Sequence, residues 1–119
     1  MRNELEQILI EKFPLYYRPN PYGCNQERFC FETEDSWFDL LLELSEKIEL
    51  MFKQYPLIYG ESFTVFQVKE KFGELRFYYN INSEGLDYAV LSVIQLSLSK
   101  CISEAERKAK DITKGNNEK

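Results

Sequence analysis

Apolar and polar positions recur along the chain with two periods, one of about 3.6 residues and one of about two residues. In residues 3–12, apolar side chains lie three or four positions apart, and Pro14 follows the segment. The same spacing runs through residues 36–55 and again through residues 83–112. Because an amphipathic helix buries one face every three or four residues, these three segments are predicted to be helices.

The period changes to two between the second and third predicted helices. Residues 63–69 and 75–81 are rich in aromatic and β-branched side chains, and they flank a short segment that holds Gly73. This pattern predicts an antiparallel hairpin with a turn of about five residues, in which Gly73 takes a positive φ. A shorter alternation of polar and aromatic residues near 29–32 predicts one further strand.

Together these elements predict an α+β fold in which the three helices cover a small antiparallel sheet. Residues 1–114 are expected to form a single domain, because no linker or repeat interrupts them. The polar residues 115–119 are expected to form a frayed tail. A chain of 119 residues is long enough for one hydrophobic core, since it buries roughly two-thirds of its unfolded surface.

Composition narrows the classes of function. Aromatic residues make up 15% of the chain, which supplies both large core side chains and good contact surfaces. The chain has no histidine, and this excludes Ser–His and Cys–His catalysis as well as histidine metal sites. No spacing of carboxylates or lysines indicates another reaction. The chain is therefore expected not to be an enzyme and to need no cofactor.

The three cysteines are Cys24, Cys30 and Cys101. Three thiolates do not complete a tetrahedral zinc site without a carboxylate such as Glu32, so no metal is expected. An odd cysteine count without a secretory signal is typical of the reducing cytoplasm. Cys24 and Cys30 are interpreted as separate thiols rather than a redox pair, and Cys101 as a small hydrophobic residue.

The charge balance excludes some partners. Fifteen basic and twenty acidic residues give a net charge of −5, so nonspecific binding to nucleic acid is not expected. No apolar run approaches the roughly 20 residues that span a membrane. Acidic residues gather at the start of the second predicted helix, where the helix dipole favours them, and are interpreted as capping and solvation rather than a cation site. They are Glu32, Glu34, Asp35 and Asp39.

Cations and aromatic rings are interleaved around the predicted hairpin turn. Fixed cations next to an aromatic plane suit a phosphate-bearing ligand that carries a base. In the alternative interpretation the hairpin is purely structural, and its charges pair with Glu70 and Glu74. Trp37 is added as a residue that lines a pocket mouth or anchors the core. The candidate binding residues are Trp37, Lys69, Lys71, Phe72, Arg76 and Tyr78.

Residues 67–78 read QVKEKFGELRFY and resemble the hallmark of a family of small uncharacterised proteins from bacteria and their phages. Residues 35–40 and 102–106 resemble two further motifs of that family. Relatives carry a C-x-x-C-G element that suggests a metal knuckle, but residues 110–115 hold no cysteine here, so no metal is carried over. The resemblance implies a phage-type accessory protein and supplies no reaction.

Three functions are considered. The preferred one is a non-catalytic binding protein, a phage-encoded inhibitor that binds a component of bacterial defence in the host cytoplasm through an acidic and aromatic surface. The second is a protein that sequesters a nucleotide-like signalling molecule in a pocket. The third is a small enzyme with carboxylate or lysine chemistry, which no residue spacing supports. The pocket of the second hypothesis is lined by Trp37, Lys69, Lys71, Arg76 and Tyr78.

A homodimer is expected to form through the third predicted helix. This helix carries a second apolar surface beside its main stripe, made by Leu86, Val90 and Val93. A single small sheet does not easily cover both surfaces, and a second copy of the chain is the simplest way to bury the remainder.

Overall fold

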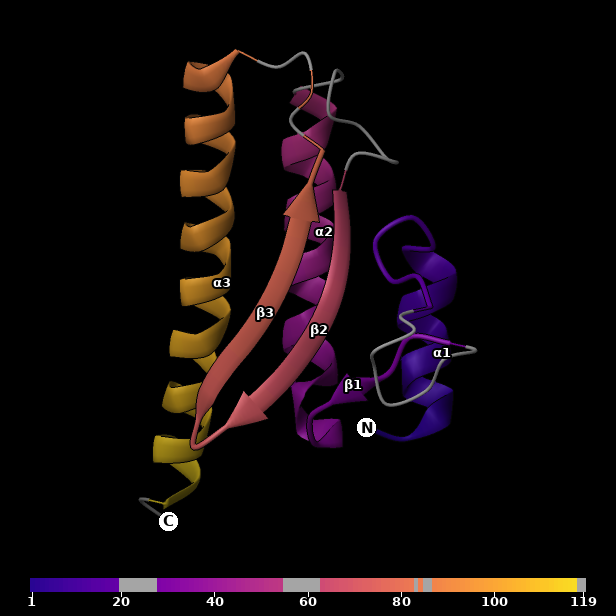
Figure 1. Ribbon diagram of the computed structural model, residues 1–119. Helices are drawn as coiled ribbons and strands as arrows, with labels where there is room; N and C mark the ends of the chain where they lie inside the picture. Colours follow the sequence, from indigo (N-terminus) through magenta and orange to yellow (C-terminus); the bar gives the residue numbers. More distant parts are fainter. Residues whose placement is uncertain (20–27, 55–62, 83, 85–86, 118–119) are drawn as a thin grey trace.

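The α+β class is confirmed by the computed structural model, which describes residues 1–19, 28–54, 63–82, 84 and 87–117 (Figure 1). These described residues form three α-helices, one short 3-10 helix and three strands. In order they are α1 (Asn3–Lys12), β1 (Phe31–Glu32), η1 (Asp35–Trp37), α2 (Phe38–Gln54), β2 (Phe63–Lys71), β3 (Glu74–Ile81) and α3 (Tyr88–Asn117).

The sheet is mixed rather than purely antiparallel. Its strand order is β1-β2-β3, and β2 pairs antiparallel with β3 as predicted. β1 runs parallel to β2, with Phe31 opposite Val68 and Glu32 opposite Lys69. The reason is the connection between the two strands, because a helix such as α2 returns the chain to the same end of the sheet and so makes the pairing parallel.

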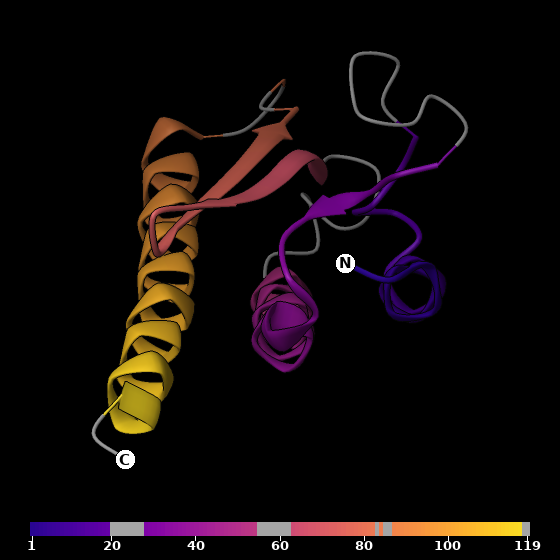
Figure 2. The same ribbon diagram turned by 90° about the horizontal axis from the view of Figure 1, so that it is seen from below.

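The helices leave one face of the hairpin uncovered. α2 lies behind β2 and β3 in Figure 1, and α3 runs along the β3 side while it packs on both α2 and β3. Figure 2 shows α1 and α2 on the same side of the sheet. We call the face of the hairpin that is turned away from α2 its outer face. No described helix covers this face (Figure 2).

Nine of the aromatic residues that the structure describes are buried in the core. The rings of Tyr17 and Phe31 have centroids 4.8 Å apart, and those of Phe52 and Phe63 are 5.0 Å apart. The contact between α2 and α3 is aliphatic in comparison. The buried aromatic residues are Phe13, Tyr16, Tyr17, Phe29, Phe31, Trp37, Phe52, Phe63 and Phe77, and the aliphatic ones between the two helices include Leu44, Ile48, Ile94 and Leu98.

Two buried polar groups tie the N-terminal part of the chain to the core. The Glu6 carboxylate is only 4% exposed and accepts hydrogen bonds from the Phe31 backbone N–H at 2.6 Å and from Arg28 at 3.0 Å. The Tyr17 hydroxyl bonds to the Ser45 hydroxyl at 2.5 Å, and burial raises the pKa of Tyr17 well above its usual range. Glu6 therefore joins α1 to β1.

The ends of the long helices differ from the prediction. α2 is preceded by the short 3-10 helix η1, and α3 begins at Tyr88, where the Asp87 carboxylate accepts a hydrogen bond from Ala89 N–H at 2.8 Å. The predicted start of this helix at Ser83 lies outside the described residues. α3 continues to Asn117 instead of ending near residue 112, so it includes part of the predicted tail.

The cysteines are not all free thiols. Cys30 is disulfide-bonded, so its interpretation as a separate thiol is wrong, and Cys24 lies outside the described residues. Cys101 is free and half-buried, and burial raises the pKa of its thiol. Because disulfides persist mainly in oxidising compartments, the cysteine count no longer supports a reducing one.

Replacement of Glu6 tests its role in this fold. Glu6→Ala leaves the Arg28 guanidinium and the Phe31 N–H without their shared acceptor, so we expect the free energy of unfolding to fall by about 2–3 kcal/mol. The matched control is Glu4→Ala at an exposed position of α1, which is expected to change it by less than about 0.5 kcal/mol. Urea unfolding measures both variants. Equal effects would show that Glu6 does not hold β1.

Candidate functional site: the outer face of the hairpin

The hairpin turn is shorter than predicted. Phe72 and Gly73 form the whole turn, because Lys71 pairs directly with Glu74. Gly73 has the predicted positive φ, 79°, and Phe72 also has a positive φ, 54°. A two-residue turn with positive φ at both positions has the twist that matches the two strands of a hairpin. Both of its positions normally hold Asn, Asp or Gly. A phenylalanine at the first place is therefore unusual.

Phe72 projects into solvent from a fixed backbone. Its side chain is 92% exposed, and the Lys71 ammonium lies 5.7 Å from the centroid of its ring. The Gly73 N–H donates to the Glu70 carboxylate at 2.8 Å, which holds the turn. A left-handed backbone at a bulky residue costs of order 1 kcal/mol. Because the ring is not buried, no hydrophobic contact offsets this cost. Phe72 therefore does not stabilise the turn.

Two cations face each other across the outer face. Lys69 pairs directly with Arg76, and the neighbouring pair Val68 and Phe77 is buried on the inner face. Like charges directly opposite each other destabilise an antiparallel sheet. Arg76 lies 3.8 Å from the Glu74 carboxylate, whereas neither Lys69 nor Lys71 makes an ion pair with a described residue. The outer face therefore keeps exposed positive charge in an acidic protein.

A stacked aromatic pair lies beside these cations. The rings of Phe66 and Tyr78 have centroids 5.9 Å apart and an interplanar angle of 15°, and the two residues are 45% and 40% exposed. A β-bulge at Phe66 creates this pair, because it turns Phe66 outward while Val65 on its other side stays buried. A hydrogen bond with Tyr78 raises the pKa of the Arg76 guanidinium.

The structure brings together most of the predicted binding residues and adds one. Trp37 is 8% exposed and is buried in the core, so it is not part of the exposed surface that the others form. Phe66 was missed, although the spacing of three between the buried Val65 and Val68 departs from the strand period and signals a bulge. We define the hairpin surface as Phe66, Lys69, Lys71, Phe72, Arg76 and Tyr78.

The structural alternative explains part of this surface. The Glu70 carboxylate accepts a hydrogen bond from the Gly73 backbone N–H, and Glu74 forms an ion pair with Arg76. Glu74 pairs with a cation as the alternative interpretation expected, whereas Glu70 holds the backbone of the turn instead. Neither Glu70 nor Glu74 forms an ion pair with Lys69 or Lys71, and the Phe72 ring stays exposed.

Acids and lysines also meet between α2 and α3. Lys47 bridges Glu43 at 3.3 Å and Glu104 at 3.0 Å, and Lys108 lies 2.5 Å from Glu43. Hydrogen bonds from the lysines lower the pKa of both carboxyl groups, and Glu104 raises the pKa of Lys47. A catalytic acid or a catalytic lysine needs shifts in the opposite directions. These groups therefore stabilise the helix pair and offer no poised acid or base.

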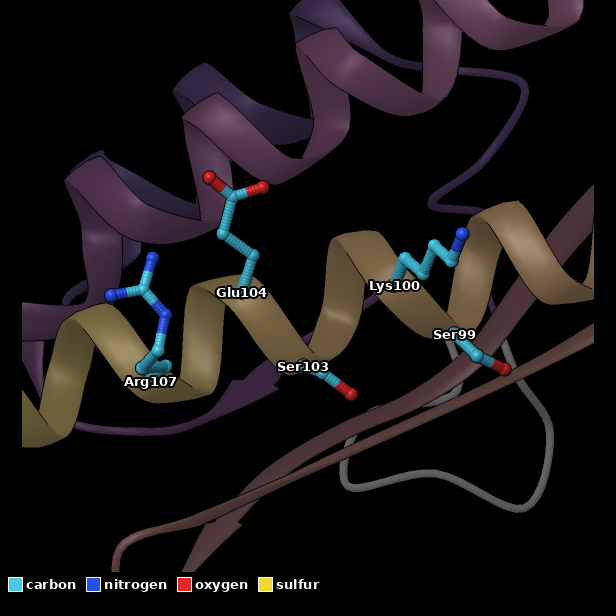
Figure 3. A pocket seen from close by; sticks show the side chains of 5 residues that line it. All are labelled: Ser99, Lys100, Ser103, Glu104 and Arg107. Atoms are coloured by element: carbon cyan, nitrogen blue, oxygen red, sulfur yellow. The ribbon is translucent and has the colours of Figure 1, made fainter.

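A shallow hollow of about 360 Å³ runs along one side of α3 (Figure 3). All the described residues that line it belong to α3, and the side chains of Glu104 and Ser103 point in different directions (Figure 3). A ligand site needs polar groups that converge on one point. The hollow contains no residue of the hairpin surface, and its lining is Ser99, Lys100, Ser103, Glu104 and Arg107.

Two of the acidic residues that precede α2 contact side chains from distant parts of the sequence. Asp35 lies 2.9 Å from the Arg2 guanidinium, and Glu32 accepts a hydrogen bond from Gln67 at 3.0 Å. No group of three or more His, Cys, Asp or Glu side chains suited to a metal ion occurs within the described ranges. None of the helices, as far as the structure describes them, is long and apolar enough to cross a membrane.

Comparison with known proteins identifies no relative. No family model, no curated protein and no solved structure matches the chain. The resemblance of residues 67–78 to a bacterial and phage family stays a prediction.

A double-mutant cycle tests the opposed cations. We expect the coupling between Lys69→Thr and Arg76→Thr to reveal a repulsion in the wild type of about 0.2–1 kcal/mol, and about 1 M salt to reduce it. The matched control is the cycle of Lys71→Thr and Glu74→Thr, a directly opposed pair of opposite charge, whose coupling should have the opposite sign. Urea unfolding of the variants gives both values. A favourable coupling between Lys69 and Arg76 would contradict this account of the outer face.

Proposed function

We propose that this chain is a non-catalytic binding protein that holds a partner protein on its hairpin surface. The observation that carries the proposal is the gathering of exposed aromatic rings and cations on a sheet face that no described helix covers (Figure 2). Aromatic residues and arginine are enriched in protein interfaces relative to the remaining surface. Features that cost stability and contribute nothing to packing are expected at functional sites.

A protein partner fits this surface better than a nucleotide-like molecule. Small ligands bind in concave pockets that bury most of their surface. Trp37, which was expected to complete such a pocket, is buried in the core instead. The hairpin surface consists of strand side chains and a projecting turn, which suit a broad contact. The net charge of −5 also disfavours a nucleic acid backbone.

The charges of the hairpin surface indicate the chemistry of the partner. Lys69 and Lys71 have no ion pair within the part of the chain that the structure describes, and the stacked rings of Phe66 and Tyr78 are about half exposed. A complementary partner therefore presents acidic groups around an apolar patch. A phage-encoded inhibitor of bacterial defence remains a specific form of this proposal, and it rests on the sequence resemblance alone.

Site-specific crosslinking tests the proposal. A photoreactive phenylalanine analogue is placed at Tyr78 and, as the control, at Leu50 of α2, which is 61% exposed outside the hairpin surface. In cells that make the chain naturally, we expect one discrete protein adduct from position 78 and none from position 50. The captured protein is then purified and titrated by calorimetry, where Arg76→Glu should weaken binding at least about tenfold. Arg76 is exposed, so this variant should keep its melting temperature.

Two results would contradict a binding role for the hairpin surface. One is the absence of any adduct from position 78. The other is the same set of adducts from positions 78 and 50, which would indicate nonspecific contact.

The homodimer expected through α3 also stays a prediction. Val93 and Leu96 are 47% and 58% exposed, Val90 is half-buried, and Leu86 lies outside the described residues. We expect sedimentation equilibrium to give the mass of a dimer for the wild type and of a monomer for Leu96→Asp. Leu50→Asp on α2 is the control and should remain dimeric. A wild-type protein that is monomeric at micromolar concentration would contradict the pairing.

A further inference from the structure

We propose that the hairpin tip is a preformed anchor, in which the Phe72 ring enters an apolar pocket with an acidic rim on the partner protein. This inference rests on the proposed function of the hairpin surface and names the contact that dominates it. Its basis is the conformation, support and charge of the residues from Glu70 to Glu74.

The conformation of Phe72 is the first argument. Its φ of 54° belongs to a backbone region that asparagine and glycine occupy readily and that bulky side chains avoid. The ring is also 92% exposed, so neither the backbone nor the core of the free protein gains from it. Strained backbone that the surrounding structure enforces clusters at binding sites. The residue therefore serves a contact that the free protein does not contain.

The support of the tip is the second argument. The Glu70 carboxylate holds the Gly73 N–H, and on the far side of the turn the Leu75 N–H donates to Glu106 of α3 at 3.2 Å. Both hydrogen bonds fix the backbone before any partner arrives. A ring on a fixed backbone loses little conformational freedom on binding, and such preorganised aromatic anchors form the centres of strong interfaces.

The charge around Phe72 indicates the rim of the pocket. The Lys71 ammonium lies 5.7 Å from the ring centroid, so it reaches the pocket mouth when the ring enters. Glu70 and Glu74 are engaged with Gly73 and Arg76, and neither forms an ion pair with Lys71. A cation that loses water at an interface needs an opposite charge. A carboxylate at the pocket mouth supplies it.

A lipid surface is the competing partner for an exposed phenylalanine, and the tip does not suit it. Stable attachment to a membrane takes more apolar area than one ring, or a ring together with a basic patch. Two carboxylates, Glu70 and Glu74, lie within two residues of Phe72, and the whole chain carries a charge of −5. Segments that bind anionic membranes cluster about four to eight basic residues, whereas the hairpin surface has only Lys69, Lys71 and Arg76, with Glu70 and Glu74 among them. The pocket of a protein is the better match.

The experiment compares Phe72→Asn with Phe72→Tyr. Asparagine adopts the positive φ without strain, so Phe72→Asn should raise the melting temperature of the free protein by about 3 °C. It should also weaken binding to the protein captured from position 78 at least about tenfold. Phe72→Tyr keeps the ring and the strain, so it should leave both the melting temperature and the affinity near their wild-type values.

The outcomes separate this inference from the proposed function. If Phe72→Asn binds the captured protein as tightly as the wild type, the anchor is overturned while the hairpin surface stands. If position 78 captures no protein at all, both fail. Sedimentation with vesicles of phosphatidylcholine and phosphatidylglycerol is the last arm. Vesicle binding that disappears in Phe72→Asn would overturn the protein pocket in favour of a lipid surface.

Discussion

One extra residue in β2 decides which side chains the hairpin presents to solvent. The bulge at Phe66 shifts the inside–outside alternation of the strand, so that Val65 and Val68 both face the core. Without it, the period of two would carry Lys69 and Lys71 inward with Val65, where burial of their charges is prohibitive. The opposed cations, the stacked ring of Phe66 and the acidic chemistry inferred for a partner all follow from this irregularity.

The elements could be predicted from the sequence because each has a simple apolar period, and that of α1 agrees with its observed bounds, Asn3–Lys12. The pairing of the strands and the length of the turn were harder to predict. The pattern around Phe31 gives the existence of β1 but not its partner, and its parallel direction depends on the path of α2 across the fold. The turn at Phe72 was assigned too many residues, because phenylalanine at a positive φ contradicts the turn preferences used to find it.

In the candidate site, too, residues close together in the sequence could be predicted, and those that depend on the tertiary structure could not. Lys69, Lys71 and Arg76 could be found because a short stretch of sequence that forms a hairpin necessarily places its residues close together. Trp37 lies far from them in sequence, and nothing local distinguishes a tryptophan at a pocket mouth from the buried one that the structure contains. The cost of the exposed Phe72 ring also became visible only when its backbone angle and its exposure were known together.

The way in which the N-terminal part joins β2 has a consequence for the order of folding. Its links to β2 are long-range in sequence, such as the hydrogen bond from Val65 N–H to the Tyr16 carbonyl at 2.9 Å and the pairing of Phe31 with Val68. The hairpin, in contrast, closes over a two-residue turn. Because loop closure favours local contacts, the hairpin and its outer face form early and the N-terminal part docks late. During synthesis on the ribosome, β1 emerges before β2 and stays unpaired until β2 is available. The N-terminal aromatic cluster is therefore the part of the nascent chain that depends longest on protection from aggregation.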